Sequence, residues 1–455
     1  MKTKQIFAAL TGLAILLVAS PGHALDIVAT NSGNWADATI WDSGTVPGVN
    51  DDADIGAGIT VTVNTNVSVQ YIYDSGTVIM APGWTLTVVG DSAGAKGTQT
   101  LGFLNATAVS NTVIYSGNAF WAKRTDYYNL VFTNSTTNSY DFYNGPIPGY
   151  GAAPMTIGGD MTMTGKIKVQ QGADITIGGK LFIGTNSSWD ASSFNLRVSG
   201  DTTVGGLLLD LNGALGSNYF GGNVTVASTA IGWNVSDVIQ WGIGGSLTNN
   251  GTIVGKGYGS ITFAGTGVIA GSKTIKIPTI TISGAYTIAD TITLTTNTPT
   301  LTGTIVFDLA RTNQIGLLAS VGTLYYSGAL QVINSGPAPS SGASFKLFNA
   351  QSYDGTFTST TFPSLPSGLS WVDNTLTTGS IAVTGSAGSP VLTLFRNGGL
   401  LTLSWDSATF PGYRVQAQTN SLGGNWGGTG SGTGGSFNIA IDPTNKAVFF
   451  RLSNP

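Results

Sequence analysis

The feature that most limits how this chain can fold is a succession of very short segments in which apolar and polar residues alternate. Residues 59–63 read Ile-Thr-Val-Thr-Val, residues 85–89 read Thr-Leu-Thr-Val-Val, and residues 279–282 read Thr-Ile-Thr-Ile. This alternation places the aliphatic side chains on one face of a strand and the threonines on the other. Gly, Asn and Asp separate the segments, as turns require. The sequence therefore predicts an all-β chain of short strands that are each buried on one face.

A pair of adjacent glycines recurs after an apolar residue through the middle of the chain. The first glycines of these pairs are Gly158, Gly178, Gly205, Gly221 and Gly244, at intervals of 20, 27, 16 and 23 residues that average 21.5. This is close to the length of one coil of a β-solenoid, in which stacked coils together build the core. Because glycine tolerates positive φ angles, we expect the pairs to form tight positive-φ corners. We predict a right-handed parallel β-solenoid (a β-helix) with coils of irregular length; a Greek-key β-sandwich is the alternative.

The composition agrees with strands and turns and disagrees with helices, disorder and nucleic-acid binding. Charged residues are 9% of the chain, all 22 acidic residues are aspartates, and 65 residues are glycine. A hydrophobic content of 41% is enough to bury a core. The pI is about 4.8 and basic runs are lacking, so the clustered Lys and Arg that bind phosphate backbones or anionic membranes are missing.

The N-terminus has the pattern of a secretory signal peptide. Lys2 and Lys4 precede an apolar stretch at residues 6–19, and Gly22 and Ala24 supply the small residues of a cleavage site. The alternative, a membrane anchor, is disfavoured because the stretch is short for a span. We predict cleavage after residue 24, which leaves 16 basic and 22 acidic residues, and a secreted or cell-surface location without a later membrane span.

The organisation along the rest of the chain changes at three places. A segment that carries Trp35 and Trp41 precedes the first regular strand and is expected to cap the open end of the stack. We expect the cap and solenoid at residues 25–310, a solenoid-closing β region at 311–385, and a short linker at 386–390. A C-terminal β-sandwich-like module, with alternating runs and a glycine-rich tract, is expected at 391–455.

Several of these segments resemble known secreted proteins. The pattern Gly33-Asn34-Trp35, continued by Val46-Pro47-Gly48, and the strand at residues 128–132 are similar to large bacterial β-solenoid proteins of the autotransporter-associated β-strand-repeat type. Residues 322–371 resemble the segment that closes such solenoids. The terminal unit resembles a β module at the C-terminus of secreted proteins in the Verrucomicrobia and Planctomycetes lineages. The resemblance implies a surface-exposed repeat architecture and transfers no catalytic residues.

The chain lacks the residues of several common catalytic and metal sites. It has no cysteine, and its one histidine, His23, lies in the predicted signal peptide. A mature chain without His or Cys cannot form a Ser-His-Asp or Cys-His nucleophilic site, or a zinc, copper or haem site with such ligands. Carboxylate chemistry stays open, because glycosidases need only two carboxylates. We expect no cofactor, with Ca²⁺ as the one candidate ion.

Two clusters are the candidate sites. The first combines aromatics with both signs of charge and could line a glycan-binding groove: Trp121, Lys123, Arg124, Asp126, Tyr127 and Tyr128. Its alternative is a loop whose aromatics pack on the flank of the solenoid. The second is Asp51, Asp52 and Asp54, whose carboxylates could hold Ca²⁺. Its alternative is a solvated turn before the first strand.

These observations favour a secreted or cell-surface structural or adhesive protein without catalytic activity, such as an adhesin, in contact with polysaccharides or other surface components. The second hypothesis is a carbohydrate-active β-helix, a polysaccharide lyase or glycoside hydrolase that uses Asp, Lys and Arg. The two differ in one structural feature: an enzyme needs a groove in which these side chains converge within hydrogen-bonding reach.

Overall fold

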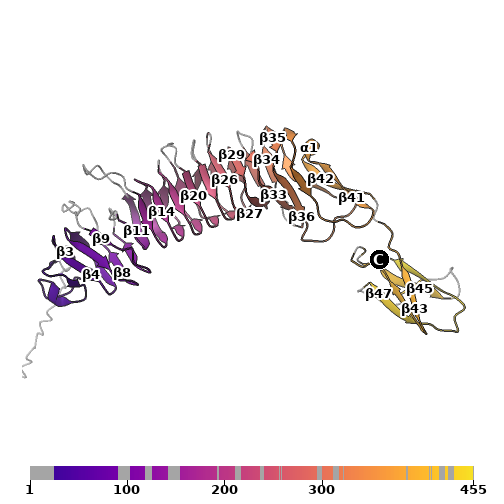
Figure 1. The fold of residues 1–455 in the computed structure, drawn as a ribbon, viewed down its shortest axis with the longest axis horizontal. Coiled ribbons are helices and arrows are strands. Elements are labelled where there is room, and N and C mark those ends of the chain that lie inside the picture. The colour runs from indigo at the N-terminus through magenta and orange to yellow at the C-terminus, as the bar shows by residue number, and fades with distance from the viewer. Residues whose placement is uncertain are drawn as a thin grey trace, which may run out of the picture. The chain divides into compact units, whose positions relative to one another are not determined.

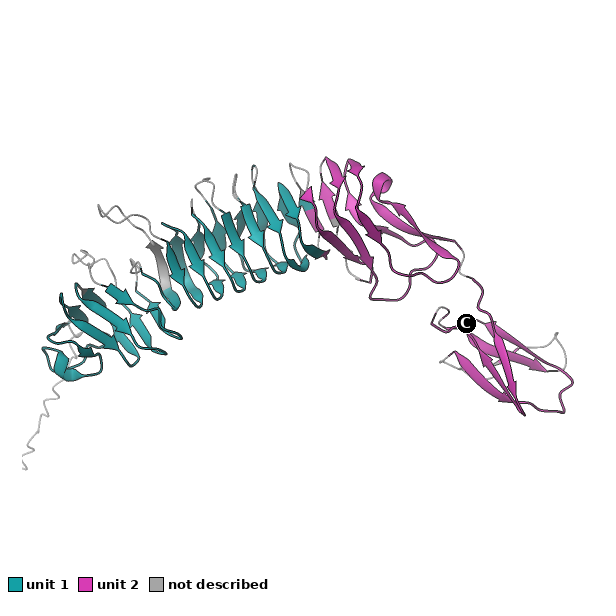
Figure 2. Ribbon diagram, viewed as in Figure 1, with its two compact units in different colours: residues 1–286, 293–299 teal, residues 287–292, 300–455 magenta. Residues whose placement is uncertain are grey.

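The computed structural model describes most of the chain after the predicted signal peptide. The described residues are 25–90, 103–117, 125–141, 154–191, 194–210, 217–235, 240–255, 257, 259–289, 291–294, 300–310, 317–320, 322–385, 388–408, 410, 412–419, 426–428 and 435–453. The predicted signal peptide, residues 1–24, lies outside them. Two compact units result, residues 1–286 with 293–299 and residues 287–292 with 300–455 (Figure 2). The predicted domain limits stay predictions.

The predicted fold class is confirmed. The chain is all-β, with a parallel β-solenoid over residues 52–333 and small antiparallel sheets at the C-terminus. Successive strands of the solenoid lie side by side along the first unit (Figure 1).

Each regular coil in the first unit contributes one short strand to each of three faces. Face 1 contains β12 (Met155–Ile157), β14 (Ile175–Ile177), β17 (Leu196–Val198), β20 (Ser217–Phe220), β23 (Gln240–Ile243), β26 (Ser260–Phe263) and β29 (Thr279–Ile282). Face 2 contains the start of β13 (Met161–Gln170), then β15 (Leu181–Ile183), β18 (Thr202–Val204), β21 (Val224–Val226), β24 (Leu247–Asn249) and β27 (Thr266–Gly271). Face 3 contains the end of β13, then β16 (Ser188–Asp190), β19 (Leu207–Leu209), β22 (Gly232–Val235), β25 (Ile253–Gly255) and β28 (Ile275–Ile277).

The strand registers measure the coil length directly. On face 1, Ser217 pairs with Gln240 and Ser260 pairs with Thr279, so these two coils advance the chain by 23 and 19 residues. The expected spacing near 21 residues is thus confirmed. Because the strands stay in register while the coils differ in length, the extra residues fall in the turns and not in the sheets.

The core is a stack of inward side chains, one row above the next. On face 1 the inward row is completely or almost completely buried and consists of Ile157, Ile177, Val198, Phe220, Ile243, Phe263 and Ile282. Between faces 1 and 3, the rings of Phe220, Trp233 and Trp241 have centroids 5.3–5.8 Å apart. Such aromatic pairs add about 0.5–1.5 kcal/mol beyond the area they bury. The apolar face of each short strand therefore finds its partner in the neighbouring coils.

The glycine pairs have a different cause from the one we expected. None of the glycines in the five pairs has a positive φ, so the positive-φ corner was wrong. Instead, the backbones of successive coils approach closely at this corner. A β-carbon on Gly222 would lie 2.5 Å from the carbonyl oxygen of Gly200, and one on Gly245 would lie 2.6 Å from that of Gly222. Glycine is required there because no side chain fits between the coils.

The N-terminal segment forms the first layer of the stack. Strand β1 (Asp26–Ala29) pairs in parallel with β3 (Asp52–Ile55), and β2 (Gly33–Asn34) pairs with β4 (Thr60–Val63). Trp35 and Trp41 are buried, pack edge to face at 5.1 Å, and are linked by a 3.0 Å hydrogen bond from the Trp41 indole nitrogen to the Trp35 carbonyl. The two tryptophans thus cover the interior at this end of the first unit.

The second unit begins with parallel coils and ends in antiparallel sheets. Strand β33 (Thr304–Asp308) pairs with β36 (Ala329–Ile333), which pairs with β40 (Ser359–Thr361). An antiparallel sheet follows, formed by β37 (Ser344–Lys346), β42 (Ser380–Gly385) and β41 (Leu369–Asn374). The C-terminal module has two three-stranded antiparallel sheets, one of β43 (Thr393–Asn397), β44 (Leu400–Ser404) and β47 (Ser436–Ala440), the other of β46 (Gly427–Gly428), β45 (Arg414–Thr419) and β48 (Val448–Ser453).

Candidate functional site

A column of polar side chains follows the glycine corner between faces 1 and 2, and we call it the corner ladder. Its members in successive coils are Asn129, Asp160, Lys180, Asp201, Asn223 and Ser246. The Asp160 carboxylate accepts a 2.7 Å hydrogen bond from the Lys180 backbone N–H, and the side-chain oxygen of Asn223 accepts a 2.9 Å hydrogen bond from the Ser246 backbone N–H. Backbone N–H groups of the following coil therefore donate hydrogen bonds to the side chains of Asn129, Asp160, Asp201, Asn223 and Ser246.

A second ladder follows the other edge of face 1. The Asp174 carboxylate accepts hydrogen bonds from the backbone and side-chain nitrogens of Asn195 at 2.8 and 2.9 Å. The Asn195 side-chain oxygen in turn accepts from the Ser217 backbone at 2.7 Å. In the sequence, Asp160, Asp174 and Asp201 cannot be distinguished from ordinary turn aspartates. Their pairing with groups about one coil further along becomes apparent only in the structure.

The predicted glycan cluster divides between described and undescribed residues. Trp121, Lys123 and Arg124 lie outside the described residues. The exposed Asp126 carboxylate accepts a 2.7 Å hydrogen bond from the Thr156 backbone, so it acts as another rung between coils. Tyr127 is buried, with its hydroxyl 3.1 Å from that of Tyr115.

Tyr128 is the described aromatic of this cluster that reaches the surface. It is partly exposed, and its ring lies over Gly158 and Gly159 of the next coil, where added β-carbons would come within 3.5 and 3.0 Å of ring atoms. Tyr127 thus belongs to the core, whereas Tyr128 packs on the flank of the solenoid and keeps part of its surface exposed.

The three aspartates of the predicted calcium site lie at the start of β3. Asp51 accepts a 2.9 Å hydrogen bond from the Gly48 backbone, Asp52 is buried, and Asp54 is partly exposed. On the outer side of the sheet, Asp52 pairs with Asp26 and Asp54 with Val28. Within the described part of the chain, no three His, Cys, Asp or Glu side chains are grouped so that they could hold a metal ion.

Face 1 carries an exposed tyrosine that sequence reasoning did not single out. Tyr219 on β20 pairs with Arg197 on β17 in one direction and with Gly242 on β23 in the other, and it keeps 37% of its surface exposed. The sequence signal is a bulky aromatic residue in an outward row whose other members are mostly threonines. That signal becomes visible only once the register between coils is known.

The ionisable groups with shifted pKa values lie in turns or in the core of the fold. Burial raises the pKa of Tyr286, whose hydroxyl donates to the Gly245 carbonyl at 3.0 Å, and burial also raises the pKa of Tyr326. Hydrogen bonds from the Thr39 side chain and backbone lower the pKa of the exposed Asp37. These shifts mark turns and core contacts, since none of the groups lies beside a converging set of charged side chains among the described residues.

Comparisons with protein-family models, with curated proteins and with solved structures found no match. The chain is therefore identified by architecture alone, as a β-solenoid protein of about 10 turns. Among the helices that the structure describes, none has the length and apolar character needed to cross a bilayer.

Proposed function

We propose that this chain is a secreted or cell-surface β-solenoid with a structural or adhesive role, without catalytic activity, and in contact with glycans or other surface components. The observation that supports the proposal is that the polar side chains at the corners are hydrogen-bonded to the neighbouring coils. Asp160, Asp174 and Asn195 each accept backbone hydrogen bonds from the next coil. Polar residues used in this way stiffen a long scaffold, which suits presentation of a surface.

The export part of the proposal rests on the predicted signal peptide at residues 1–24. The glycan part rests on two aromatic side chains on the flank of the solenoid, the partly exposed Tyr128 and the exposed Tyr219. Aromatic rings flanked by hydrogen-bonding side chains suit sugars, because a pyranose offers an apolar C–H face and polar hydroxyls. The undescribed Trp121, Lys123 and Arg124 stay part of the proposed contact region.

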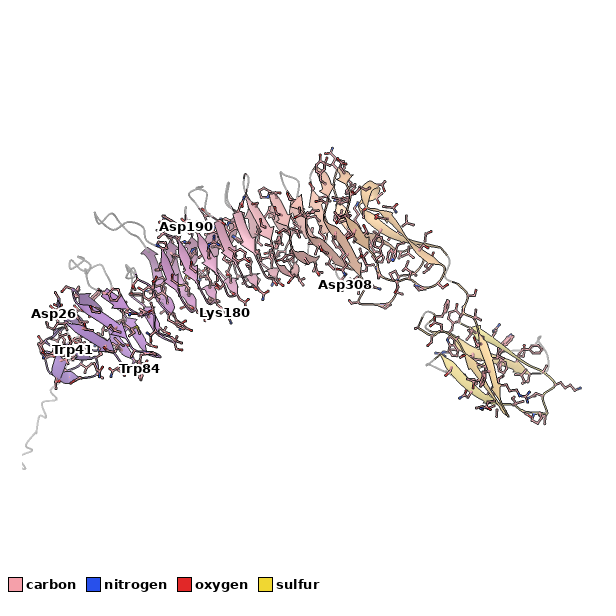
Figure 3. All side chains as sticks on the ribbon, in the orientation of Figure 1. Asp26, Trp41, Trp84, Lys180, Asp190 and Asp308 are labelled. Atoms are coloured by element: carbon pink, nitrogen blue, oxygen red, sulfur yellow. The ribbon has the colours of Figure 1, made fainter. Side chains whose placement is uncertain are left out.

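One observation favours the alternative, a carbohydrate-active enzyme. Asp160, Lys180 and Asp201 occupy the same column in three successive coils, which places the two carboxylate positions two strand spacings, about 9.4–9.8 Å, apart. This separation is at the upper limit of the roughly 6.5–9.5 Å between the carboxylates of inverting glycosidases. Against this reading, both aspartates already accept backbone hydrogen bonds, at 2.7 and 2.9 Å. In Figure 3, Lys180 and Asp190 lie on opposite sides of the solenoid, so Asp190 does not complete the group.

The two functions are separated by one experiment on purified residues 25–455. The protein is incubated with a panel of polysaccharides, and both retention on the polymer and release of reducing or unsaturated ends are measured. The proposal expects retention without release. Release that disappears in Asp160→Asn and Asp201→Asn would establish the enzyme instead. Neither retention nor release on any polymer would contradict the glycan part.

A further inference from the structure

The outer side of face 1 presents one central side chain per coil. The registers place these side chains in a single column: Thr156, Thr176, Arg197, Tyr219, Gly242, Thr262 and Thr281. Six of the seven are uncharged, and the neighbours in the column are about 4.8 Å apart. The column thus offers one guanidinium and one aromatic ring side by side, with uncharged residues at its other positions, while the aspartates of the two ladders lie along the edges of the face.

The orientation of the Tyr219 ring follows from the glycines of the next coil. A β-carbon on Gly242 would lie 2.6 Å from a ring carbon of Tyr219, and one on Gly244 would lie 2.7 Å from its hydroxyl oxygen. The side chain therefore lies along the sheet over residues 242–244, in space that any other residue at position 242 would fill. One side of the ring rests on the backbone, and the exposed 37% belongs to its outer side and edges.

Residues with hydrogen-bonding side chains occupy outward positions next to Tyr219 in the register. Arg197 is adjacent in the column, Ser217 lies two residues earlier on the same strand, and Gln240 pairs with Ser217 in the next coil. All three are exposed. A flat aromatic ring bordered by a guanidinium, an amide and a hydroxyl matches a sugar that stacks through its C–H face and bonds through its edge.

We propose that Tyr219, Arg197 and Gln240 form a subsite for a uronic acid residue of a linear polysaccharide. The inference deepens the glycan contact proposed above and rests on it. The Arg197 guanidinium pairs with the uronate carboxylate, because its fork of N–H donors matches the two carboxylate oxygens. Tyr219 stacks on the pyranose ring, and Gln240 bonds its hydroxyls. The polysaccharide continues along the threonine column.

The test is calorimetric titration of residues 25–455 with oligogalacturonate and, separately, with neutral xylo-oligosaccharide. We expect oligogalacturonate to bind more tightly. Tyr219→Ala and Arg197→Gln should each weaken its binding by about tenfold or more, which corresponds to about 1.4 kcal/mol, whereas Tyr219→Phe should bind nearly as the wild type does. Phe182→Ala is the matched control, because Phe182 is a similarly exposed aromatic (39%) on face 2.

Gly242→Ala tests the orientation of the ring without removing it. The new β-carbon displaces the Tyr219 ring, and binding should fall while the thermal unfolding temperature stays close to that of the wild type. Equal affinity for the two oligosaccharides, or wild-type affinity in Tyr219→Ala and Arg197→Gln, would contradict the proposed subsite. The proposed glycan contact would still hold in that case if another polysaccharide binds. Absence of binding to every polysaccharide would overturn both.

Discussion

Gly200 and Gly179, in neighbouring coils, are joined by a backbone hydrogen bond and lie too close for a side chain on Gly200. The Gly200 backbone nitrogen donates a 2.9 Å hydrogen bond to the Gly179 carbonyl oxygen, and a β-carbon on Gly200 would lie 2.5 Å from that same oxygen. The contact that joins the two coils therefore also forbids a side chain. This relationship explains why glycine recurs at the corner without any positive φ.

Replacing Gly200 should consequently destabilise the first unit. In Gly200→Ala the methyl group forces the coils apart, and overpacking of this kind costs about 1–3 kcal/mol. We expect a lower midpoint in urea unfolding followed by circular dichroism. Gly56→Ala is the control, since its β-carbon would meet nothing within 4 Å. Equal midpoints for the two variants would contradict the role of the close approach.

The corner ladder predicts a difference between two substitutions at one residue. Asp160→Asn keeps an oxygen that can accept from the Lys180 backbone N–H, whereas Asp160→Ala leaves that N–H without this acceptor. Loss of such a bond costs about 0.5–1.5 kcal/mol. Hydrogen exchange at the Lys180 amide should therefore accelerate in Asp160→Ala and change little in Asp160→Asn. Similar exchange in both variants would show that the ladder does not hold the coils.

We predict that the second unit loses stability at alkaline pH because it buries Tyr326. Burial raises the pKa of this tyrosine above its ordinary 10.0, and its hydroxyl donates to the Thr375 carbonyl at 2.9 Å. The unfolded chain releases this proton near pH 10 and the folded chain retains it. The stabilisation is therefore complete below pH 10 and is lost as the pH rises beyond it.

The measurement is the urea midpoint of Tyr326→Phe and the wild type at pH 8, 10 and 11. The variant should be less stable at pH 8, by about 1 kcal/mol for the lost hydrogen bond, and should decline less between pH 10 and 11. Tyr325→Phe, at an exposed neighbouring position, serves as the control. If the urea midpoints of the wild type and Tyr326→Phe fell equally between pH 10 and 11, Tyr326 would not be the cause of the alkaline loss of stability.

The C-terminal module has a small core of its own, formed by Leu403, Trp405 and Val415 with partly buried neighbours such as Phe437 and Phe450. Trp405→Ala removes the largest of these side chains, a change that costs about 3–5 kcal/mol. A module of this size has little stability to spare, so we expect it to unfold. Limited proteolysis should then remove residues after about 390 and leave the solenoid intact; a solenoid cleaved at the same rate would contradict a separate core.

The sequence predicted the strands and the repeat better than the contacts between coils. Alternation in segments such as Thr279–Ile282 is a local pattern, so the strand and its buried face follow from a few residues. The spacing of the glycine pairs predicted the coil length, but the predicted reason for glycine, a positive φ, was wrong. Glycine is needed because the backbone carbonyl of the neighbouring coil lies too close for a side chain, and that contact cannot be read from the local sequence. The partner of Asp174, Asn195, is 21 residues further along.

The candidate site shows the same limit. Tyr127 and Tyr128 are adjacent in the sequence, yet one is buried and the other lies over the glycines of the next coil. The orientation of the Tyr219 ring depends on Gly242 in the following coil. The pairing of these two residues cannot be read from a local sequence pattern. Residue types indicated a glycan contact; which ring is presented to solvent depends on how the coils align.

The side-chain hydrogen bonds between coils give the solenoid a direction. The Asn129, Asp160 and Asn195 side chains all accept from backbone groups of the coil that follows, whereas Asn218 accepts from Leu196 of the coil before. A coil already in place thus acts as a template for the next, so growth from the N-terminus should proceed more readily than growth from the C-terminus. Truncation on either side of a coil exposes backbone groups at a sheet edge, but truncation before a coil also removes the side-chain acceptors that had bound its backbone N–H groups. Amino-terminal deletions should therefore aggregate sooner than carboxy-terminal deletions of equal length, and the reverse order in light-scattering measurements would refute this polarity.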